Sequence, residues 1–326
     1  MSAPAGRSLQ INRLWPLGWL ICRRLLSGAL VLLASATVTF FALRLTPGDP
    51  VRAVLGGPTA NPTPETVARA IAEFGLDRPL PVQYLLHIGR LLRGDLGTSF
   101  SQHQQVSAVI AEQIGPTLWL TGSAVAVAWL LSTLSVLATA RRGWALSAVG
   151  SAAETMAAAL PQFWLGLVLL AVFAFGLRWF PPQSDGGFLG MVLPTLALAV
   201  PLAGFLAQVT RESFELALDQ PFILSARMRG LGEGAVRWRH GLRHAALPGI
   251  SLSAWAIGSL IGNAVLVEVI FSRPGLGRVL YQAVSVQDMP LTIGVTLVVT
   301  LVYVVASLAV DLLYILVDPR LKAKRT

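Results

Sequence analysis

Six long apolar runs without a charged residue constrain this chain more than any other feature of its sequence. A helix needs about 20 mainly apolar residues to cross a hydrocarbon core about 30 Å thick. The runs of this length are 25–43, 113–140, 155–177, 186–210, 245–267 and 289–310. The third is expected to begin earlier, near Trp144, and to include Glu154. The pattern predicts an all-α polytopic membrane protein with six transmembrane helices.

Composition agrees with this class and excludes others. Only 13% of the residues are charged, and the mean hydropathy is +0.66. A soluble domain carries about 25% charged residues. The net charge of +9 is compatible with nucleic-acid binding, but no basic run is interleaved with aromatic residues, and lysine occurs only as Lys322 and Lys324. We therefore expect the arginines to mark the cytoplasmic face, and no nucleic-acid partner.

The distribution of basic residues predicts the orientation. If the N-terminus is cytoplasmic, most of the Arg and Lys residues fall in cytoplasmic segments, with a dense group between positions 211 and 243. Because cytoplasmic loops carry the excess of Arg and Lys, both termini are expected in the cytoplasm. The first run could instead be a cleaved signal peptide, since Ala34-Ser35-Ala36 resembles a cleavage site. Its continuation to Leu43 favours a membrane anchor.

These assignments divide the chain into segments. We expect short helices in the outer loop, one from Thr63 to Phe74 and an amphipathic one over 82–92. The predicted segments are an N-terminal extension (1–20), a first span (21–45), a long outer loop (46–112), a core with the second to sixth spans (113–320) that contains a cytoplasmic loop (211–246), and a basic tail (321–326).

The sequence contains no motif that indicates catalysis, metal binding or ATP binding. A single cysteine, Cys22, excludes an intramolecular disulfide and a cysteine-based metal cluster. No glycine-rich loop ends in Gly-Lys-Ser/Thr, so a phosphate-loop ATPase site is excluded. His240 and His244 lie four residues apart, but Gly241 stands where a zinc protease needs glutamate. We expect no catalytic residue, bound metal or cofactor in this chain, and any ATP to be bound by another subunit.

The cytoplasmic loop contains a short, punctuated helix. Pro221 suits a first helical position, and Gly230 suits the left-handed position that closes a helix. Phe222, Ile223 and Ala226 fall on one side at helical spacing. The sequence therefore predicts a helix whose apolar side docks on another protein.

These residues resemble a known family. The runs Ser225-Ala226-Arg227-x-Arg229-Gly230-Leu231, His240-x-Leu242-Arg243 and Leu247-Pro248 resemble the coupling loop of ATP-binding-cassette (ABC) importer permeases, in particular the peptide/nickel branch. Leu224 stands where the generic motif has glutamate. Further matching motifs, in order, are Leu45-Thr46-Pro47-Gly48-Asp49-Pro50, Gly94-Asp95-Leu96-Gly97, Leu160-Pro161-Gln162-Phe163-Trp164, Glu268 to Gly277, Asp288-Met289-Pro290 and Asp318-Pro319-Arg320.

The resemblance implies a fold and an assembly. It implies the type I ABC importer permease fold in a bacterial cytoplasmic membrane, with no catalysis in this chain. The implied partners are a second permease, two cytoplasmic ATPases that bind ATP and Mg, and an extracytoplasmic solute-binding protein. The residues assigned to ATPase coupling are Pro221, Phe222, Ile223, Ser225, Ala226, Arg227, Arg229, Gly230 and Leu231.

Polar residues inside the spans are the candidates for the transport pathway. They are expensive in a bilayer, so a cavity or an interhelical hydrogen bond explains them. Glu154 has no evident partner in the sequence, and Glu268 is expected at the outer gate or at the binding protein. The gate and pathway candidates are Gln162, Gln208, Asn263, Glu268, Phe271, Pro274 and Gly275.

Three functions remain open at this point. The first is import of di- or oligopeptides by alternating access, driven by the partner ATPases. The second is import of nickel or a metal chelate by the same kind of machine. The third is an ion-coupled secondary transporter, which the absence of paired intramembrane charges disfavours.

Overall fold

The computed structural model describes residues 11–45, 63–65, 67, 71, 77–183 and 187–317. The start of the predicted extension (1–10), most of the predicted helix 63–74 and the basic tail (321–326) lie outside this part. Its helices are α1 (Ile11–Leu45), α4 (Leu80–Leu92), α5 (Val106–Thr139), α6 (Trp144–Ala159), α7 (Gln162–Leu169) with the π-helical η1 (Leu170–Gly176), α8 (Phe188–Leu218), α9 (Pro221–Met228), α10 (Glu233–Ala235) with the π-helical η2 (Val236–Gly241), α11 (Leu242–Ile270), α12 (Leu276–Ser285) and α13 (Met289–Val317).

The predicted class is all-helical, and the described part agrees. Within it, four helices are long and apolar enough to cross a membrane: Cys22–Leu45, Val106–Thr139, Phe188–Leu218 and Met289–Ala309. A bent pair of helices brings the number to five. The predicted fifth span lies in α11, whose apolar part Ala256–Ile270 is shorter than these. Six spans and the sidedness of the termini therefore stay predictions.

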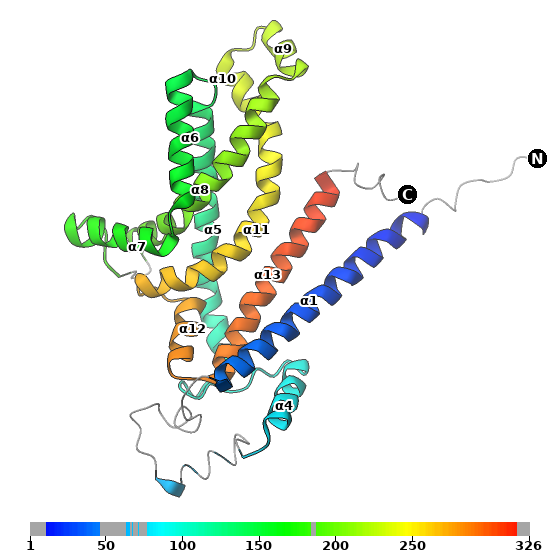
Figure 1. The fold of residues 1–326 in the computed structure, drawn as a ribbon, viewed down its shortest axis with the longest axis vertical. Coiled ribbons are helices and arrows are strands. Elements are labelled where there is room, and N and C mark those ends of the chain that lie inside the picture. Colours follow the sequence, from blue (N-terminus) through cyan, green and yellow to red (C-terminus); the bar gives the residue numbers. More distant parts are fainter. Residues whose placement is uncertain are drawn as a thin grey trace, which may run out of the picture.

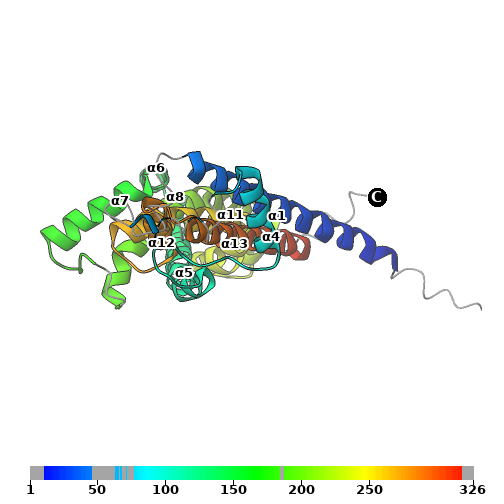
Figure 2. The same cartoon turned by 90° about the horizontal axis from the view of Figure 1, so that it is seen from below.

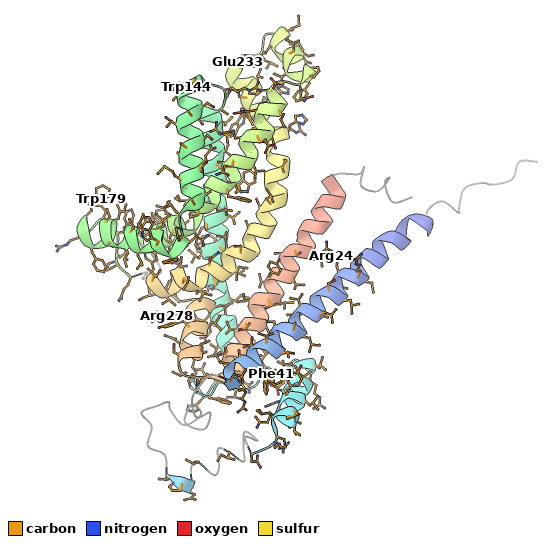
Figure 3. All side chains as sticks on the ribbon, in the orientation of Figure 1. Arg24, Phe41, Trp144, Trp179, Glu233 and Arg278 are labelled. Atoms are coloured by element: carbon orange, nitrogen blue, oxygen red, sulfur yellow. The ribbon has the colours of Figure 1, made fainter. Side chains whose placement is uncertain are left out.

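The predicted third span is not one straight helix. α6 and the α7–η1 segment meet at an angle of 99°. Leu160 is extended, with φ −73° and ψ 125°, because the ring of Pro161 disfavours the helical conformation of the residue before it. The α7 arm consequently projects sideways from the bundle, with Trp179 just beyond η1 at its far end (Figures 1 and 3).

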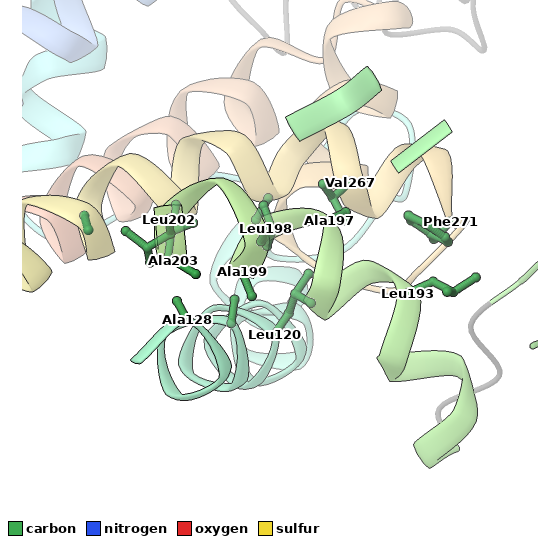
Figure 4. Close-up of a cluster of buried hydrophobic side chains, with 14 of the residues drawn as sticks. Leu120, Ala128, Leu193, Ala197, Leu198, Ala199, Leu202, Ala203, Val267 and Phe271 are labelled. Atoms are coloured by element: carbon green, nitrogen blue, oxygen red, sulfur yellow. The ribbon is translucent and has the colours of Figure 1, made fainter. Parts of the chain in front are cut away.

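The core is built where α5, α8 and α11 cross. Figure 4 shows its small side chains, such as Ala128, Ala199 and Ala203, among the larger Leu120, Leu198 and Leu202. Small residues let membrane helices approach closely. The extreme case is Gly204 of α8, where a Cβ atom would lie 2.5 Å from the backbone of α6.

Two helices stand apart from this bundle at one end. α1 and α13 run side by side and diverge from α5, α6 and α8 toward the end that carries α9 (Figure 1), and α1 extends away from the bundle on the side opposite α7 (Figure 2). Gly258 lets α13 lie against α11, since its Cβ would be 2.1 Å from the Tyr303 ring. Gly258 thus packs inside the subunit, whereas a Cβ at Gly262 meets nothing within 4 Å.

Candidate functional site

The predicted loop helix is present as α9, at one end of the bundle (Figure 1). Pro221 occupies its first turn, and Gly230 has φ +78°. The Leu231 N–H donates to the Ala226 carbonyl at 3.3 Å, and the Gly230 N–H donates to the Arg227 carbonyl at 2.9 Å. This pair of bonds is a Schellman closure, which needs a residue that tolerates the left-handed conformation.

The apolar side of α9 is not where the sequence placed it. Ile223 and Ala226 are fully buried and pack on Val236 within this chain, so they do not form a docking surface. The exposed apolar side chains are Leu224 and Met228, at 60% and 82% exposure. Both pairs follow helical spacing, so only the position of the following segment decides which one is covered.

Two ionic contacts lie at or next to α9. Arg227 Nε donates to Glu233 Oε1 at 2.7 Å, at the start of α10 (Figure 3 labels Glu233). Arg141, just after α5, pairs with Asp219 at the end of α8, with two bonds of 2.5 and 2.7 Å. The hydrogen bond from Arg141 lowers the pKa of Asp219 below its ordinary value. Both pairs are exposed and contribute little stability on their own.

Arg237 makes a buried attachment between the loop and the bundle. Its Nη2 donates to the carbonyls of Leu137 at 3.1 Å and Ala140 at 2.7 Å, at the end of α5. Its guanidinium lies 5.0 Å from the centroid of the Phe214 ring in α8. A cation at a helix C-terminus satisfies carbonyls that have no helical partner. η2 is therefore fixed to α5 and α8 together.

Glu154 has a partner that the sequence did not reveal. Arg211 Nε donates to its Oε2 at 2.8 Å, and Arg211 Nη2 donates to its Oε1 at 2.7 Å. Ser135 of α5 donates to Oε1 at 2.6 Å, and Thr139 accepts from Arg211. The expectation of an unpartnered Glu154 was wrong, because Arg211 was placed in the cytoplasmic loop. It belongs to α8, which continues to Leu218.

Glu268 lies at the other end of the bundle and is fully buried. Its Oε2 accepts the N–H groups of Gly277 at 2.7 Å and Arg278 at 3.2 Å, in the first turn of α12. Its Oε1 accepts the Thr117 hydroxyl of α5 at 2.7 Å. The carboxylate thus caps α12 from the end of α11. A Cβ at position 275 would lie 2.2 Å from the Glu268 carboxyl, so this close approach requires Gly275.

Asp288, which the sequence analysis named only as part of a family motif, makes a similar buried site. Its Oδ2 accepts the hydroxyls of Ser99 at 2.6 Å and Ser101 at 2.8 Å, from the loop before α5. Its Oδ1 accepts the Leu291 N–H at 3.2 Å in the first turn of α13. An aspartate directly before a long apolar run is a typical N-cap and could have been recognised as one.

The remaining gate and pathway candidates do not come together in one site. Asn263 donates to the Ser259 carbonyl of its own helix at 3.0 Å. Phe271 belongs to the apolar core, and Pro274 is exposed. Gln208 is half-buried in α8. Gln162 is half-buried beside the α6–α7 break, and its Oε1 is buried with no partner among the described residues.

Metal ligands do not gather in the part of the chain that the structure describes, which holds no group of three or more His, Cys, Asp or Glu side chains in ligating positions. The His244 ring instead lies tilted against the Phe222 ring, with centroids 4.6 Å apart. His240, His244, Arg239 and Arg243 line a basic hollow of about 530 Å³ next to Leu231. This end of the molecule is suited to protein contacts.

Comparison with known proteins identifies the family. Residues 112–323 match the family described as binding-protein-dependent transport system inner membrane component, and residues 19–121 match its N-terminal family. The chain belongs to this family. It is the permease component of a binding-protein-dependent ABC importer and a multi-pass protein of the bacterial inner membrane, so the resemblance found in the sequence is confirmed.

The sequences of individual relatives align with nearly the whole chain. The glutathione transport system permease protein GsiC of Salmonella choleraesuis is 34% identical over 93% of this chain and 99% of that protein. A peptide permease protein of Brucella suis biovar 1 is 35% identical over 92% and 97%. A solved amino acid ABC transporter is 18% identical, with a TM-score of 0.48, over 66% of this chain and 94% of that one.

Proposed function

We propose that this permease forms, with a second permease, the membrane pathway for short peptides such as glutathione. A solute-binding protein delivers the substrate, and two cytoplasmic ATPases drive alternating access. The relatives reported above are glutathione and peptide permeases, which favours peptides over nickel. Both carboxylate oxygens of Glu154 accept hydrogen bonds from Arg211, and Oε1 also accepts from Ser135, so the pair offers no open carboxylate oxygen to a coupling ion.

The observation that carries this proposal is the construction of α9. Its inner face is buried within the chain, so the exposed Leu224 and Met228 are the residues available to a partner. The exposed Arg227 and Arg229 flank them, and Arg227 is held by Glu233. A small apolar anchor with a polar rim is the usual centre of a protein interface. We infer that these two side chains enter a groove of the ATPase.

A force on α9 reaches the spans through the polar contacts described above. Arg237 joins η2 to α5, and Arg141 joins the end of α5 to the end of α8. The Glu154–Arg211 pair joins α6 to α8. These contacts let the α9 end of the bundle move as one body, as alternating access by rigid-body rotation requires. Gln162, at the α6–α7 break, is our first candidate for a substrate contact.

The test is co-purification of the complete importer with Leu224→Asp/Met228→Asp in this permease. We expect about 30-fold weaker retention of the ATPase, as loss of interface anchors produces. Val284→Asp is the matched control, because Val284 is an exposed apolar residue of α12 at the other end of the bundle. ATPase retained at the wild-type level by the double variant would contradict the docking role.

The substrate class is tested separately on the reconstituted importer with its binding protein. We expect uptake of labelled glutathione or a dipeptide to depend on ATP and to be unaffected by excess Ni²⁺. Peptide uptake that continues after ATP depletion would contradict the importer mechanism. ATP-driven uptake of ⁶³Ni without peptide uptake would instead make nickel the substrate.

A further inference from the structure

Residues of α1, α4, the loop before α5 and the start of α13 line a cavity of about 570 Å³. α4 and the start of α13 lie at the end of the molecule opposite α9 (Figure 1). Four arginines line it, namely Arg44, Arg78, Arg90 and Arg93, against a single acidic residue, Asp95. None of the four forms a salt bridge with another described residue. The cavity therefore has an excess of positive charge that the described part of the chain does not neutralise.

The packing of α4 against α1 shows where this cavity lies along the first span. Tyr84, Ile88 and Leu91 of α4 lie against Phe40 and its neighbours near the end of α1. The Tyr84 hydroxyl is 2.8 Å from Thr37 Oγ1. Thr37 and Phe40 belong to the apolar run of the first span, so α4 packs beside the end of that run. From the predicted topology we infer that this end lies at the level of the lipid headgroups. Figure 3 labels Phe41 at this point.

The outer side of α4 is apolar and uncovered. Leu85, Leu86 and Leu92 are exposed, and Leu86 also lines the cavity next to Arg90. An amphipathic helix with exposed leucines beside arginines is typical of a helix that lies in the membrane interface. A soluble anion would satisfy the arginines and leave the leucines in water, whereas a phospholipid covers both.

We propose that this cavity binds an anionic phospholipid of the outer leaflet, with the phosphodiester on the arginines and the acyl chains along the exposed leucines of α4. Arginine matches phosphate geometry with two parallel hydrogen bonds. Arg90 and Arg93 are exposed and line the cavity, so they are free to turn toward a headgroup. Gly89 lies between them and Leu86, and its missing side chain keeps the space open, since a Cβ there meets nothing within 4 Å.

The structure offers two kinds of variant. Arg90→Gln/Arg93→Gln removes the charge from exposed positions and leaves the packing of α4 unchanged. Gly89→Leu keeps every charge and adds bulk to the cavity at a position where a Cβ meets nothing within 4 Å. Arg178→Gln is the matched control, because Arg178 is an exposed arginine placed by the predicted topology on the same side of the membrane and outside the cavity. Arg90→Lys/Arg93→Lys tests whether charge alone is sufficient.

The experiment measures lipid retained by the complete detergent-purified importer, by native mass spectrometry, with phosphatidylglycerol and phosphatidylcholine offered in equal amounts. We expect the wild type to retain phosphatidylglycerol preferentially. The double Gln variant should retain roughly 25-fold less, about fivefold for each arginine near an anionic lipid. Gly89→Leu should also lose the preference, Arg178→Gln should keep it, and the Lys variant should recover most of it.

Several results would overturn the proposal. Equal retention of both lipids, or an equal loss in Arg178→Gln, would show bulk charge attraction instead of a site. Displacement of the lipid by inorganic phosphate would make free phosphate the ligand. Wild-type lipid retention by the double Gln variant, together with loss of the solute-binding protein, would make this surface a protein contact. None of these outcomes depends on the proposed transport of peptides.

Discussion

The two ends of the bundle bury their carboxylates in different ways. At the α9 end, Glu154 is paired with a buried cation, Arg211, across two helices. At the other end, Glu268 and Asp288 are satisfied by hydroxyls and by N–H groups in the first turns of α12 and α13. Removing one member of the ion pair leaves the other charge buried without a partner. Removing one donor from a capping carboxylate leaves its other hydrogen bonds in place.

This difference has a functional meaning. An ion pair joins two helices side by side, so in the mechanism proposed above it would keep α6 and α8 together while the ATPase moves the attached loop. A capping carboxylate fixes the start of the next helix, so it sets the direction of the chain at the α12 end. Under that proposal the α9 end transmits a force, and the other end holds its turns in one geometry.

Breaking the ion pair should give the largest effect. Arg211→Ala leaves the Glu154 carboxylate buried without its cation, and we expect a loss of about 3–5 kcal/mol in the free energy of unfolding. The measurement is the unfolding midpoint of the importer in SDS-containing micelles. Glu154→Gln/Arg211→Met should recover most of the loss, because neither charge is then left alone. Asp219→Ala, which breaks an exposed pair, should cause no measurable change.

Weakening the Glu268 cap should give an intermediate effect. Glu268→Gln keeps one acceptor oxygen but replaces the charged acceptor of the Gly277 and Arg278 N–H groups. We expect a loss of about 2 kcal/mol, within the range for hydrogen bonds to charged groups, measured by the same midpoint. Uptake per assembled importer should stay near the wild-type level. An unchanged midpoint with abolished uptake would instead assign Glu268 to the gate.

The effect of His87 of α4 should appear only through pH. Burial and the neighbouring Arg90 lower its pKa from 6.5 to about 4. The folded state therefore favours neutral His87, so its contribution is complete above pH 6.5 and is lost as the pH falls toward 4. The unfolding midpoint of wild type should fall over this interval. His87→Leu should reduce the fall, and an identical fall in both proteins would exclude His87 as its source.

Much of the α9 end could be predicted from the sequence because its signals are local. Pro221 and Gly230 act on their own backbone, and they mark the two ends of α9 as expected. The break at Leu160–Pro161 has the same kind of local cause. It was missed because the apolar run continues through it, and hydropathy does not register a change of direction.

The partners of the buried groups had to come from the tertiary structure. Arg211 lies 57 positions from Glu154, and Thr117 lies 151 positions from Glu268. No local pattern relates such residues. The same holds for α9, where burial by Val236 selects Ile223 and Ala226 as inner residues and leaves Leu224 and Met228 outside.

The sequence by itself determined that the chain is a helical membrane protein, because apolar length and helix punctuation depend only on neighbouring residues. The order of its motifs was enough to indicate the family. The tertiary structure alone decided which charges meet, which face of α9 is free, and where cationic and apolar side chains form a cavity beside α1. These features depend on how helices far apart in the sequence pack, and packing is a property of the whole fold.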